Sequence, residues 1–271
     1  MKTILLTNRS DVAQVAEAAQ VDEVFVDLEV TGKLQRQKGR DTVISQHSID
    51  DVSRVRRALN RTSLLVRCNP MGPYSRGELE RIIEAGADVV MLPYFHDASE
   101  VEEFISIISG RAATRLLVET PGAVSNIVEI VSLEGIDGVH VGLNDLHIAY
   151  QSTSMFEPFC NGLLESLTSV FRGAGVPFGI GGVAHMSSDL RPSPKRVIAE
   201  HRRLGSSAVI LSRSFTKIHT EKMSQTVVDQ LHRDLTDLRD WWSLLNSWTE
   251  ADFKDNRAKL QAQIIELIKH F

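Results

Sequence analysis

Eight short apolar runs, rich in β-branched residues, alternate along the chain with longer stretches of helical spacing. This alternation constrains the fold more than any other feature, because strands separated by helices form parallel sheets through βαβ units. Each run is almost continuously apolar, as expected for strands that are buried on both faces. The predicted strands are residues 3–6, 23–28, 63–66, 88–92, 115–118, 138–141, 177–180 and 208–211.

The stretches between these runs predict amphipathic helices, among them residues 49–59, 76–85, 99–108 and 121–133. Gly86 follows the second of these, where a left-handed helix stop is expected before the next strand. Pro121 begins the last of them, at a position where a missing N–H has no cost. Eight such units in order favour an α/β fold of the closed (β/α)₈ TIM-barrel type, with an open doubly wound sheet as the alternative.

The end of the chain has a different pattern, with helical spacing and no further strand. We therefore expect a (β/α)₈ barrel domain over residues 1–220 and a C-terminal helical extension over residues 221–271. Trp241, Trp242 and Trp248 concentrate apolar area in this extension. Either the barrel of the same chain or a neighbouring subunit would cover that face.

Composition limits the class of protein. The 271 residues are 42% hydrophobic and 24% charged with a net charge of −5, and no basic run stands apart, which argues against nucleic-acid binding. Cys68 and Cys160 cannot form a disulfide framework and lack zinc-site spacing, so we expect buried or semi-buried thiols in a reducing compartment. The N-terminal apolar run is too short for a signal peptide, and no segment reaches membrane-span length. We expect a cytoplasmic protein with no membrane partner.

Polar residues end several of the predicted strands, where a barrel assembles its active site. They are Asp27 and Glu29 after the second strand, Arg67 after the third, Glu119 after the fifth, and Asn144 and Asp145 after the sixth. Glu119 and Asp145 suit a hard cation such as Mg²⁺ or Mn²⁺, and Arg67 offers a planar fork for a substrate carboxylate. A 2-oxo acid chelated by that metal would form a stabilised enolate, the intermediate of aldol chemistry. The alternative is a set of salt bridges around the rim.

Five segments resemble the HpcH/HpaI aldolase and citrate lyase β-subunit family, and the resemblance extends over about residues 21–215. They are VFVDLE (24–29), LLVRCNP (64–70), EAGADVVMLPYF (84–95), LLVETPGAVSNIVEI (116–130) and GIDGVHVGLNDLHIAY (135–150). The resemblance implies a modified TIM barrel of the phosphoenolpyruvate/pyruvate superfamily, commonly a homo-oligomer such as a hexamer. It also implies a divalent metal, Mg²⁺ or Mn²⁺, that binds pyruvate or a related 2-oxo acid as an enolate, with an aldehyde as the second small-molecule partner.

Carried over by motif, the resemblance implies site residues as well. Glu119 and Asp145 would be the metal ligands, and Arg67 would bind the carboxylate of the 2-oxo acid. Asp27 and Glu29 would lie on the acid/base side of the pocket. Gly142, Asn144 and Gly181 would contribute to substrate binding; Gly181 lies in the segment 179–182 (GIGG), which resembles the family's Gly-rich loop after the seventh strand. A tight barrel turn with no ligand is the alternative for this segment.

Val30 departs from the family pattern, because the hydroxy-acid aldolases have a histidine there and the citrate-lyase-like branch has an aspartate. The acid/base therefore stays open among Lys33, Arg36, Arg40, His47, His140 and His147. His47 is the best imidazole candidate because loops after strands reach the mouth, with a surface or capping histidine as the alternative. His140 lies inside a strand pattern and is expected in the core, and His147 is a candidate for a substrate contact.

The leading functional hypothesis is a metal-dependent (class II) carbon–carbon lyase or aldolase. Two alternatives remain: a lyase that acts on a CoA thioester of malyl or citramalyl type, and a barrel that has lost catalysis and serves in binding or assembly. Val30 is the reason for the last.

Overall fold

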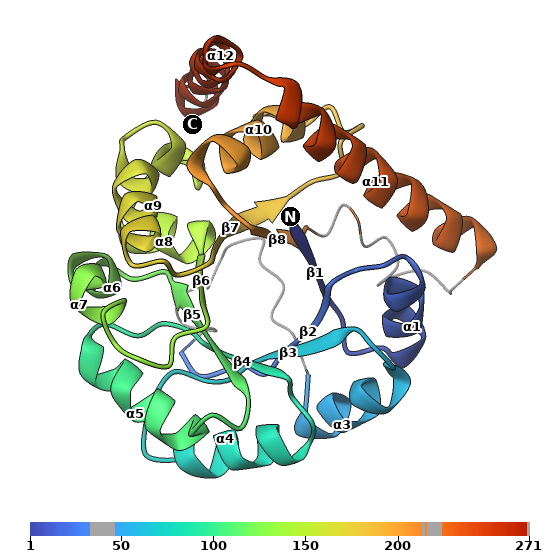
Figure 1. Ribbon diagram of the computed structural model, residues 1–271, viewed down its shortest axis with the longest axis vertical. Coiled ribbons are helices and arrows are strands. Elements are labelled where there is room, and N and C mark those ends of the chain that lie inside the picture. The colour runs from blue at the N-terminus through green and yellow to red at the C-terminus, as the bar shows by residue number, and fades with distance from the viewer. Residues whose placement is uncertain (33–46, 213–214, 216–223, 270–271) are drawn as a thin grey trace.

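The computed structural model describes residues 1–32, 47–212, 215 and 224–269. Within these ranges, eight parallel strands close into a barrel in chain order (Figure 1). The strands are β1 (Lys2–Leu6), β2 (Glu23–Asp27), β3 (Ser63–Arg67), β4 (Val89–Leu92), β5 (Ala113–Val118), β6 (Gly138–Val141), β7 (Phe178–Val183) and β8 (Ala208–Leu211). The predicted (β/α)₈ barrel is confirmed, and the open sheet is wrong.

Helices form the outer layer of the molecule. They are α1 (Ser10–Ala18), α3 (Ile49–Ala58), α4 (Ser75–Glu84), α5 (Ala98–Ile108), α6 (Pro121–Ser125), α7 (Ile127–Ile130), α8 (Leu143–Ala149), α9 (Leu163–Gly173), α10 (Pro194–Leu204), α11 (Gln225–Leu244) and α12 (Glu250–Lys269). The single helix predicted over 121–133 is instead two short helices that meet at Asn126. No helix in the described ranges is long and apolar enough to span a bilayer.

Apolar side chains form two separate cores. The smaller one contains alternate strand residues, such as Phe25, Leu65 and Leu117, and fills the barrel. The larger one contains the intervening residues, such as Val24 and Val26, together with the apolar faces of the helices. Because side chains alternate along a strand, the two clusters tell which residues of each strand point into the barrel.

A buried ion pair occupies the amino-terminal end of the barrel. Glu23 and Arg115 lie two residues before Phe25 and Leu117 and therefore also point inward. The Arg115 guanidinium donates two hydrogen bonds to the Glu23 carboxylate, one of them 2.8 Å long. Burial alone would raise the pKa of Glu23, but its bonds to Arg115 hold that pKa below its usual value.

The GIGG segment was expected to be a turn after the seventh strand, and that expectation is wrong, because the segment belongs to β7 itself. Its glycines leave room for large neighbours. A Cβ on Gly179 would lie 2.3 Å from Nδ1 of His140, and one on Gly181 would lie 2.6 Å from Cδ1 of Leu143. His140 is buried inside the barrel, as predicted, and its Nε2 bonds the Gly181 carbonyl oxygen at 2.9 Å.

Helices α11 and α12 pack on α10 and so cover the barrel of their own chain (Figure 1). The Trp241 indole N–H donates to the Lys195 carbonyl oxygen at 2.9 Å, and Trp248 lies edge-on to Trp241. We expected either the barrel of the same chain or a neighbouring subunit to cover the tryptophans. Through α10, the barrel of the same chain covers at least part of this face.

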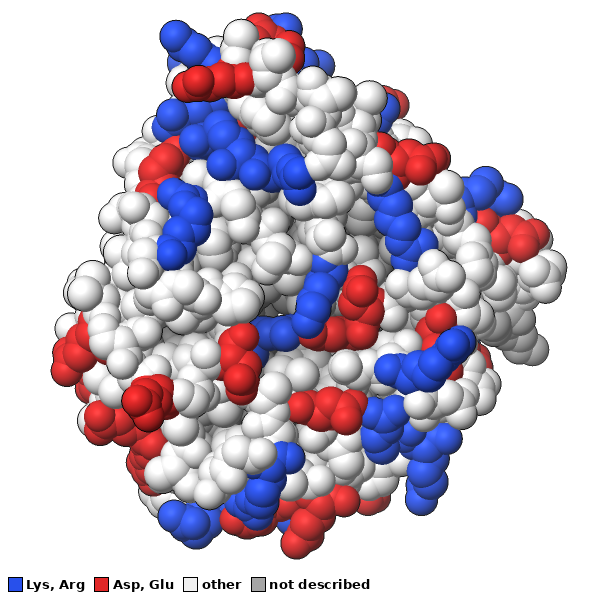
Figure 2. Space-filling view, viewed as in Figure 1, with Lys and Arg blue, Asp and Glu red and all other residues white. Residues whose placement is uncertain are grey.

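Basic side chains gather over α9, α10 and α12 in the upper part of the face shown in Figure 2. Three arginines of these helices are engaged within the chain. Arg203 bonds Glu200 and Glu165, Arg257 pairs with Glu165, and Arg172 donates to the Leu204 carbonyl oxygen. These contacts tie the three helices together.

Candidate active site

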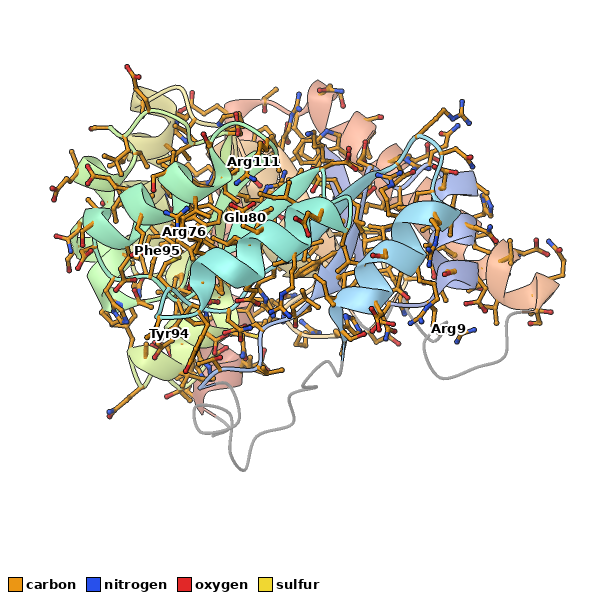
Figure 3. The ribbon with its side chains drawn as sticks, turned by 90° about the horizontal axis from the view of Figure 1, so that it is seen from below. Arg9, Arg76, Glu80, Tyr94, Phe95 and Arg111 are labelled. Atoms are coloured by element: carbon orange, nitrogen blue, oxygen red, sulfur yellow. The ribbon has the colours of Figure 1, made fainter. Side chains whose placement is uncertain are left out.

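The carboxyl end of the barrel gathers charged side chains because of the two-residue period of the strands. Asp27, Arg67 and Glu119 each lie two residues after an inward-facing residue of the barrel core, namely Phe25, Leu65 and Leu117. All three therefore point toward the barrel axis at its mouth. Figure 3 shows the barrel from the side, with Tyr94, which follows β4, near one end and Arg111, which precedes β5, near the other.

Arg67 is held by two carboxylates at the tip of β2. Asp27 and Arg67 are register partners of β2 and β3, and the guanidinium forms two parallel bonds of 2.8 Å to the Asp27 carboxylate. Nη1 lies 3.3 Å from Oε2 of Glu29. Burial alone would lower the pKa of Arg67, but Asp27, Glu29 and Glu119 raise it above its usual value. The cation is therefore permanent, and its fork is oriented by Asp27.

Glu119 is fixed on both sides of its carboxylate. Its side chain is buried, and Oε1 accepts a hydrogen bond of 3.1 Å from the Tyr94 backbone N–H. Tyr94 has a φ of +51°, the left-handed region that a tyrosine rarely adopts. On the other side, a Cβ on Gly142 would lie 2.8 Å from Oε2 of Glu119. The left-handed backbone of Tyr94 and the absence of a side chain on Gly142 together fix the position of the Glu119 carboxylate.

Asp145 lies one strand further, in the first turn of α8, and is 7% exposed. Its helix begins directly after β6, which pairs with β5. Glu119 and Asp145 thus follow neighbouring strands, as predicted, and Asn144 precedes Asp145 in the same turn. A negative side chain is also favourable at this end of a helix, because the helix dipole is positive there.

The donor set at these two strand tips fits a hard cation. Glu119 directly follows β5 and Asp145 lies in the first turn of α8, so these two strand tips would supply two carboxylates. Among the described residues no group of three or more His, Cys, Asp and Glu side chains forms a possible metal site. Mg²⁺ is commonly bound by one or two carboxylates, with water and substrate oxygens completing its octahedron. Glu119 and Asp145 are the residues that would hold it.

His47 lies against the tip of β2. Its Nδ1 accepts a hydrogen bond of 3.0 Å from the Asp27 backbone N–H, so a neutral His47 carries its proton on Nε2. His147 lies at the end of α8, and Val30 is 48% exposed just beyond Glu29. The other acid/base candidates, Lys33, Arg36 and Arg40, lie outside the described residues.

Three residues of the mouth were not identified from the sequence as parts of the site. Asn69 accepts hydrogen bonds of 2.9 Å from the backbone N–H groups of Val30 and Thr31, which fixes the chain as it leaves the site. Tyr94 supplies the backbone donor to Glu119, and its left-handed φ has no signal in the sequence. His185 follows β7 and lies edge-on to Phe215. Its place two residues after a strand was a signal that could have been read.

Comparisons with known proteins bear on the family and the fold of the chain. Residues 4–173 match the model of the HpcH/HpaI aldolase/citrate lyase family. A solved HpcH/HpaI aldolase/citrate lyase family protein from Burkholderia cenocepacia superposes with a TM-score of 0.64 at 16% identity, covering 81% of this chain and 91% of that one. An HpcH/HpaI aldolase from Desulfitobacterium hafniense gives 0.61 at 15% identity, covering 81% and 90%. At such identities the structures show a shared fold.

A curated relative, a pyruvate kinase of Methylorubrum extorquens, is 26% identical over 204 residues. The match covers 71% of this chain but only 40% of that protein, so the chain spans less than half the length of this relative. The family model, in contrast, covers more than half of the chain, in a region that contains most of β1, all of β2 to β6, and Asp27, Glu29, Arg67, Glu119 and Asp145. The chain therefore belongs to the HpcH/HpaI aldolase/citrate lyase family.

Proposed function

We propose that the chain is a metal-dependent carbon–carbon lyase or aldolase that acts on pyruvate or a related 2-oxo acid. The observation that carries this proposal is the position of the Arg67 guanidinium, which is mostly shielded from solvent, bonds Asp27 and interacts electrostatically with Glu119. A fixed cation beside a carboxylate pair suits a ligand with a carboxylate and a neighbouring keto oxygen. The Methylorubrum relative is named pyruvate kinase, a name that refers to the same 2-oxo acid.

Each residue of the mouth has a role in this proposal. Asp27 keeps the Arg67 fork oriented, and the substrate carboxylate takes the Nη1 edge, where the contact with Glu29 is the longer one at 3.3 Å. Glu119 and Asp145 hold the cation. When bound, the cation polarises the keto oxygen and stabilises the enolate. The remaining residues then need only remove and return a proton.

The proton transfer is assigned to the side of the site that contains His47. The pyruvate methyl group loses a proton, its carbon bonds the carbonyl carbon of the aldehyde, and the aldehyde oxygen takes up a proton to become a hydroxyl. Because Nδ1 of His47 is engaged by the Asp27 N–H, Nε2 is the nitrogen that would exchange a proton with substrate. His47 would take the role of the histidine that the family's hydroxy-acid aldolases have at the position of Val30.

Exchange of the pyruvate methyl protons for deuterium, followed by proton NMR in the presence of Mg²⁺ or Mn²⁺, tests this function. The wild type is expected to exchange, and Glu119→Gln is expected to abolish exchange. Glu80→Gln is the matched control, because it removes a carboxylate that pairs with Arg111 on the surface. Loss of exchange in both variants, or in neither, would remove Glu119 from the site.

Two results would point to the other functions. Cleavage of a malyl-CoA analogue without any pyruvate exchange would assign the chain to the CoA-thioester lyases. Mn²⁺ binding without exchange and without turnover of any aldehyde would assign it to binding or assembly.

A further inference from the structure

The side chain of Asn69 joins the tips of β2 and β3 at the mouth of the barrel. Its Oδ1 accepts hydrogen bonds of 2.9 Å from the backbone N–H groups of Val30 and Thr31. Its Nδ2 donates a hydrogen bond of 3.3 Å to the Leu28 carbonyl oxygen. An asparagine can make both kinds of bond because its amide carries an acceptor and a donor. One side chain thus bonds the peptide groups on both sides of Glu29.

Glu29 is the residue that this arrangement holds in place. Its backbone N–H donates a hydrogen bond of 3.1 Å to Oδ1 of Asp27, and its Oε2 lies 3.3 Å from Nη1 of Arg67. The Glu29 side chain is fully buried. The distance between its carboxylate and the guanidinium therefore depends on the backbone of residues 28–30, which Asn69 holds.

Glu78 in turn fixes Asn69. Oε1 of Glu78 accepts a hydrogen bond of 2.7 Å from Nδ2 of Asn69 and a longer one of 3.3 Å from the Asn69 backbone N–H. Glu78 lies in the first turn of α4, where the helix dipole favours a carboxylate. Because a carboxylate only accepts hydrogen bonds, this contact turns Nδ2 toward α4 and leaves Oδ1 to face the Val30 and Thr31 N–H groups.

We infer that Asn69 and Glu78 are positioning residues of the mouth. They hold Glu29 back from a short bond to Arg67. The 3.3 Å between Glu29 and Nη1 is longer than the 2.8 Å bonds between Arg67 and Asp27. Opposite charges attract, so a Glu29 with a released backbone would move onto Nη1 and compete with the substrate carboxylate for that edge. The inference rests on the proposed function and adds to it two residues that act only through Glu29.

Asn69→Asp tests this role in the pyruvate methyl exchange assay. The new carboxylate would lie where Nδ2 now donates to Glu78 at 2.7 Å, and the two like charges would drive residue 69 out of place. KM for pyruvate is expected to rise about tenfold, the effect of one lost bond to a charged group, while kcat stays within about twofold. Adding Glu78→Gln to Asn69→Asp restores a donor opposite the carboxylate and the original total charge. KM should then return to within about threefold of the wild-type value.

The matched control is Asn60→Asp, the same substitution in an equivalent pair. Nδ2 of Asn60 donates to Oε2 of Glu17 at 3.0 Å, and Asn60 lies before β3, at the opposite end of that strand from Arg67. The variant therefore creates the same kind of repulsion away from the mouth. Its KM for pyruvate should equal that of the wild type, even where its stability is lower.

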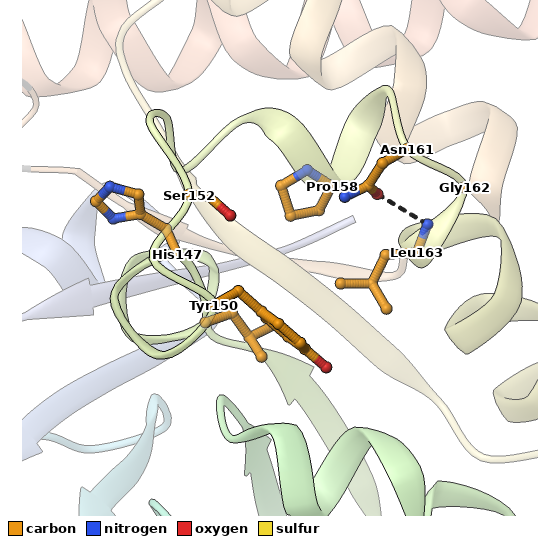
Figure 4. A pocket seen from close by; sticks show the side chains of 8 residues that line it. His147, Tyr150, Ser152, Pro158, Asn161, Gly162 and Leu163 are labelled. Atoms are coloured by element: carbon orange, nitrogen blue, oxygen red, sulfur yellow. Dashed lines mark hydrogen bonds between the residues drawn. The ribbon is translucent and has the colours of Figure 1, made fainter. Parts of the chain in front are cut away.

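Amide hydrogen exchange tests the contact without any turnover. In Asn69→Ala the backbone N–H groups of Val30 and Thr31 lose their acceptor, so their exchange is expected to accelerate by at least about tenfold. Ser152→Ala is the control for this measurement. It removes a side chain from a pocket of about 520 Å³ between the end of α8 and the start of α9, and the eight described residues of that lining do not include Asn69 (Figure 4).

An unchanged KM in Asn69→Asp would overturn the inference, as would a rise that Glu78→Gln does not reverse or an equal rise in Asn60→Asp. A fall in kcat at constant KM would overturn it too. If the wild type exchanges no pyruvate protons, the proposed function fails, and amide exchange then decides. Faster exchange at Val30 and Thr31 in Asn69→Ala would retain Asn69 as the residue that holds this backbone, and unchanged exchange would reject it.

Discussion

Gly142→Ala tests whether the mouth is built to fix Glu119. The added Cβ would lie 2.8 Å from Oε2 and 2.9 Å from Cβ of Glu119, and 3.3 Å from Cδ1 of Leu117. Ordinary carbon contacts begin near 3.5 Å, so Glu119 would have to move by about half an ångström or more. It cannot do so freely, because its Oε1 is held by the Tyr94 N–H.

We expect the variant to fold with a stability loss of about 1–3 kcal/mol, the usual cost of overpacking. Its Mn²⁺ affinity should fall by roughly 10- to 100-fold, as when a metal ligand loses its orientation. Titration of Mn²⁺ followed by electron paramagnetic resonance measures this affinity without substrate. Gly77→Ala in α4 is the control, since nothing lies within 4 Å of its new Cβ. Wild-type Mn²⁺ affinity in Gly142→Ala would refute the reasoning, as would an equal loss in the control.

Three further predictions concern Arg67, the buried ion pair and pH. Arg67→Lys keeps the charge but loses the two parallel bonds to Asp27, so KM for pyruvate should rise more than tenfold in the exchange assay; an unchanged KM would exclude Arg67 from carboxylate binding. Glu23→Gln leaves Arg115 buried without its anion and should cost about 3–5 kcal/mol in urea unfolding, and a cost below about 1 kcal/mol would contradict the inward placement of the pair. Burial lowers the pKa of His140 to about 4, below the unfolded value of about 6.5, so stability should fall as pH drops from about 6.5 through 4. His140→Asn should weaken this dependence without removing it, because burial also lowers the pKa of His201, to about 3, and an unaltered pH profile would exclude His140 as a source.

The strands were readable from the sequence because each is a compact apolar run, and all eight lie where they were predicted. The segment 179–182, which was expected to be a turn and lies in β7, was misread for a physical reason. Gly179 and Gly181 have no side chain, so hydrophobic periodicity cannot detect them, yet His140 and Leu143 fill the space that they leave. A glycine-rich strand therefore has the sequence signature of a turn, and only the neighbouring strand tells the two apart.

The site was only partly readable. Strand ends located Asp27, Arg67, Glu119 and Asp145, because a charge that follows a buried strand stands out. The partners of these charges were not readable, since the two parallel bonds between Arg67 and Asp27 depend on the register of β2 and β3. The contribution of Tyr94 comes from its backbone conformation, which leaves no mark on residue type.

One repeated spacing explains why this barrel can carry charge at both ends. In β2 and β5 the inward residues run Glu23, Phe25, Asp27 and Arg115, Leu117, Glu119, so each strand has a charge, an apolar side chain and a second charge. At the amino end the two charges are opposite and neutralise each other. At the mouth both are acidic, and the cation comes from Arg67 of β3. The charges of the amino end are therefore satisfied within the chain, whereas the mouth combines a guanidinium with acids from several strands, an arrangement that suits the ligand proposed above.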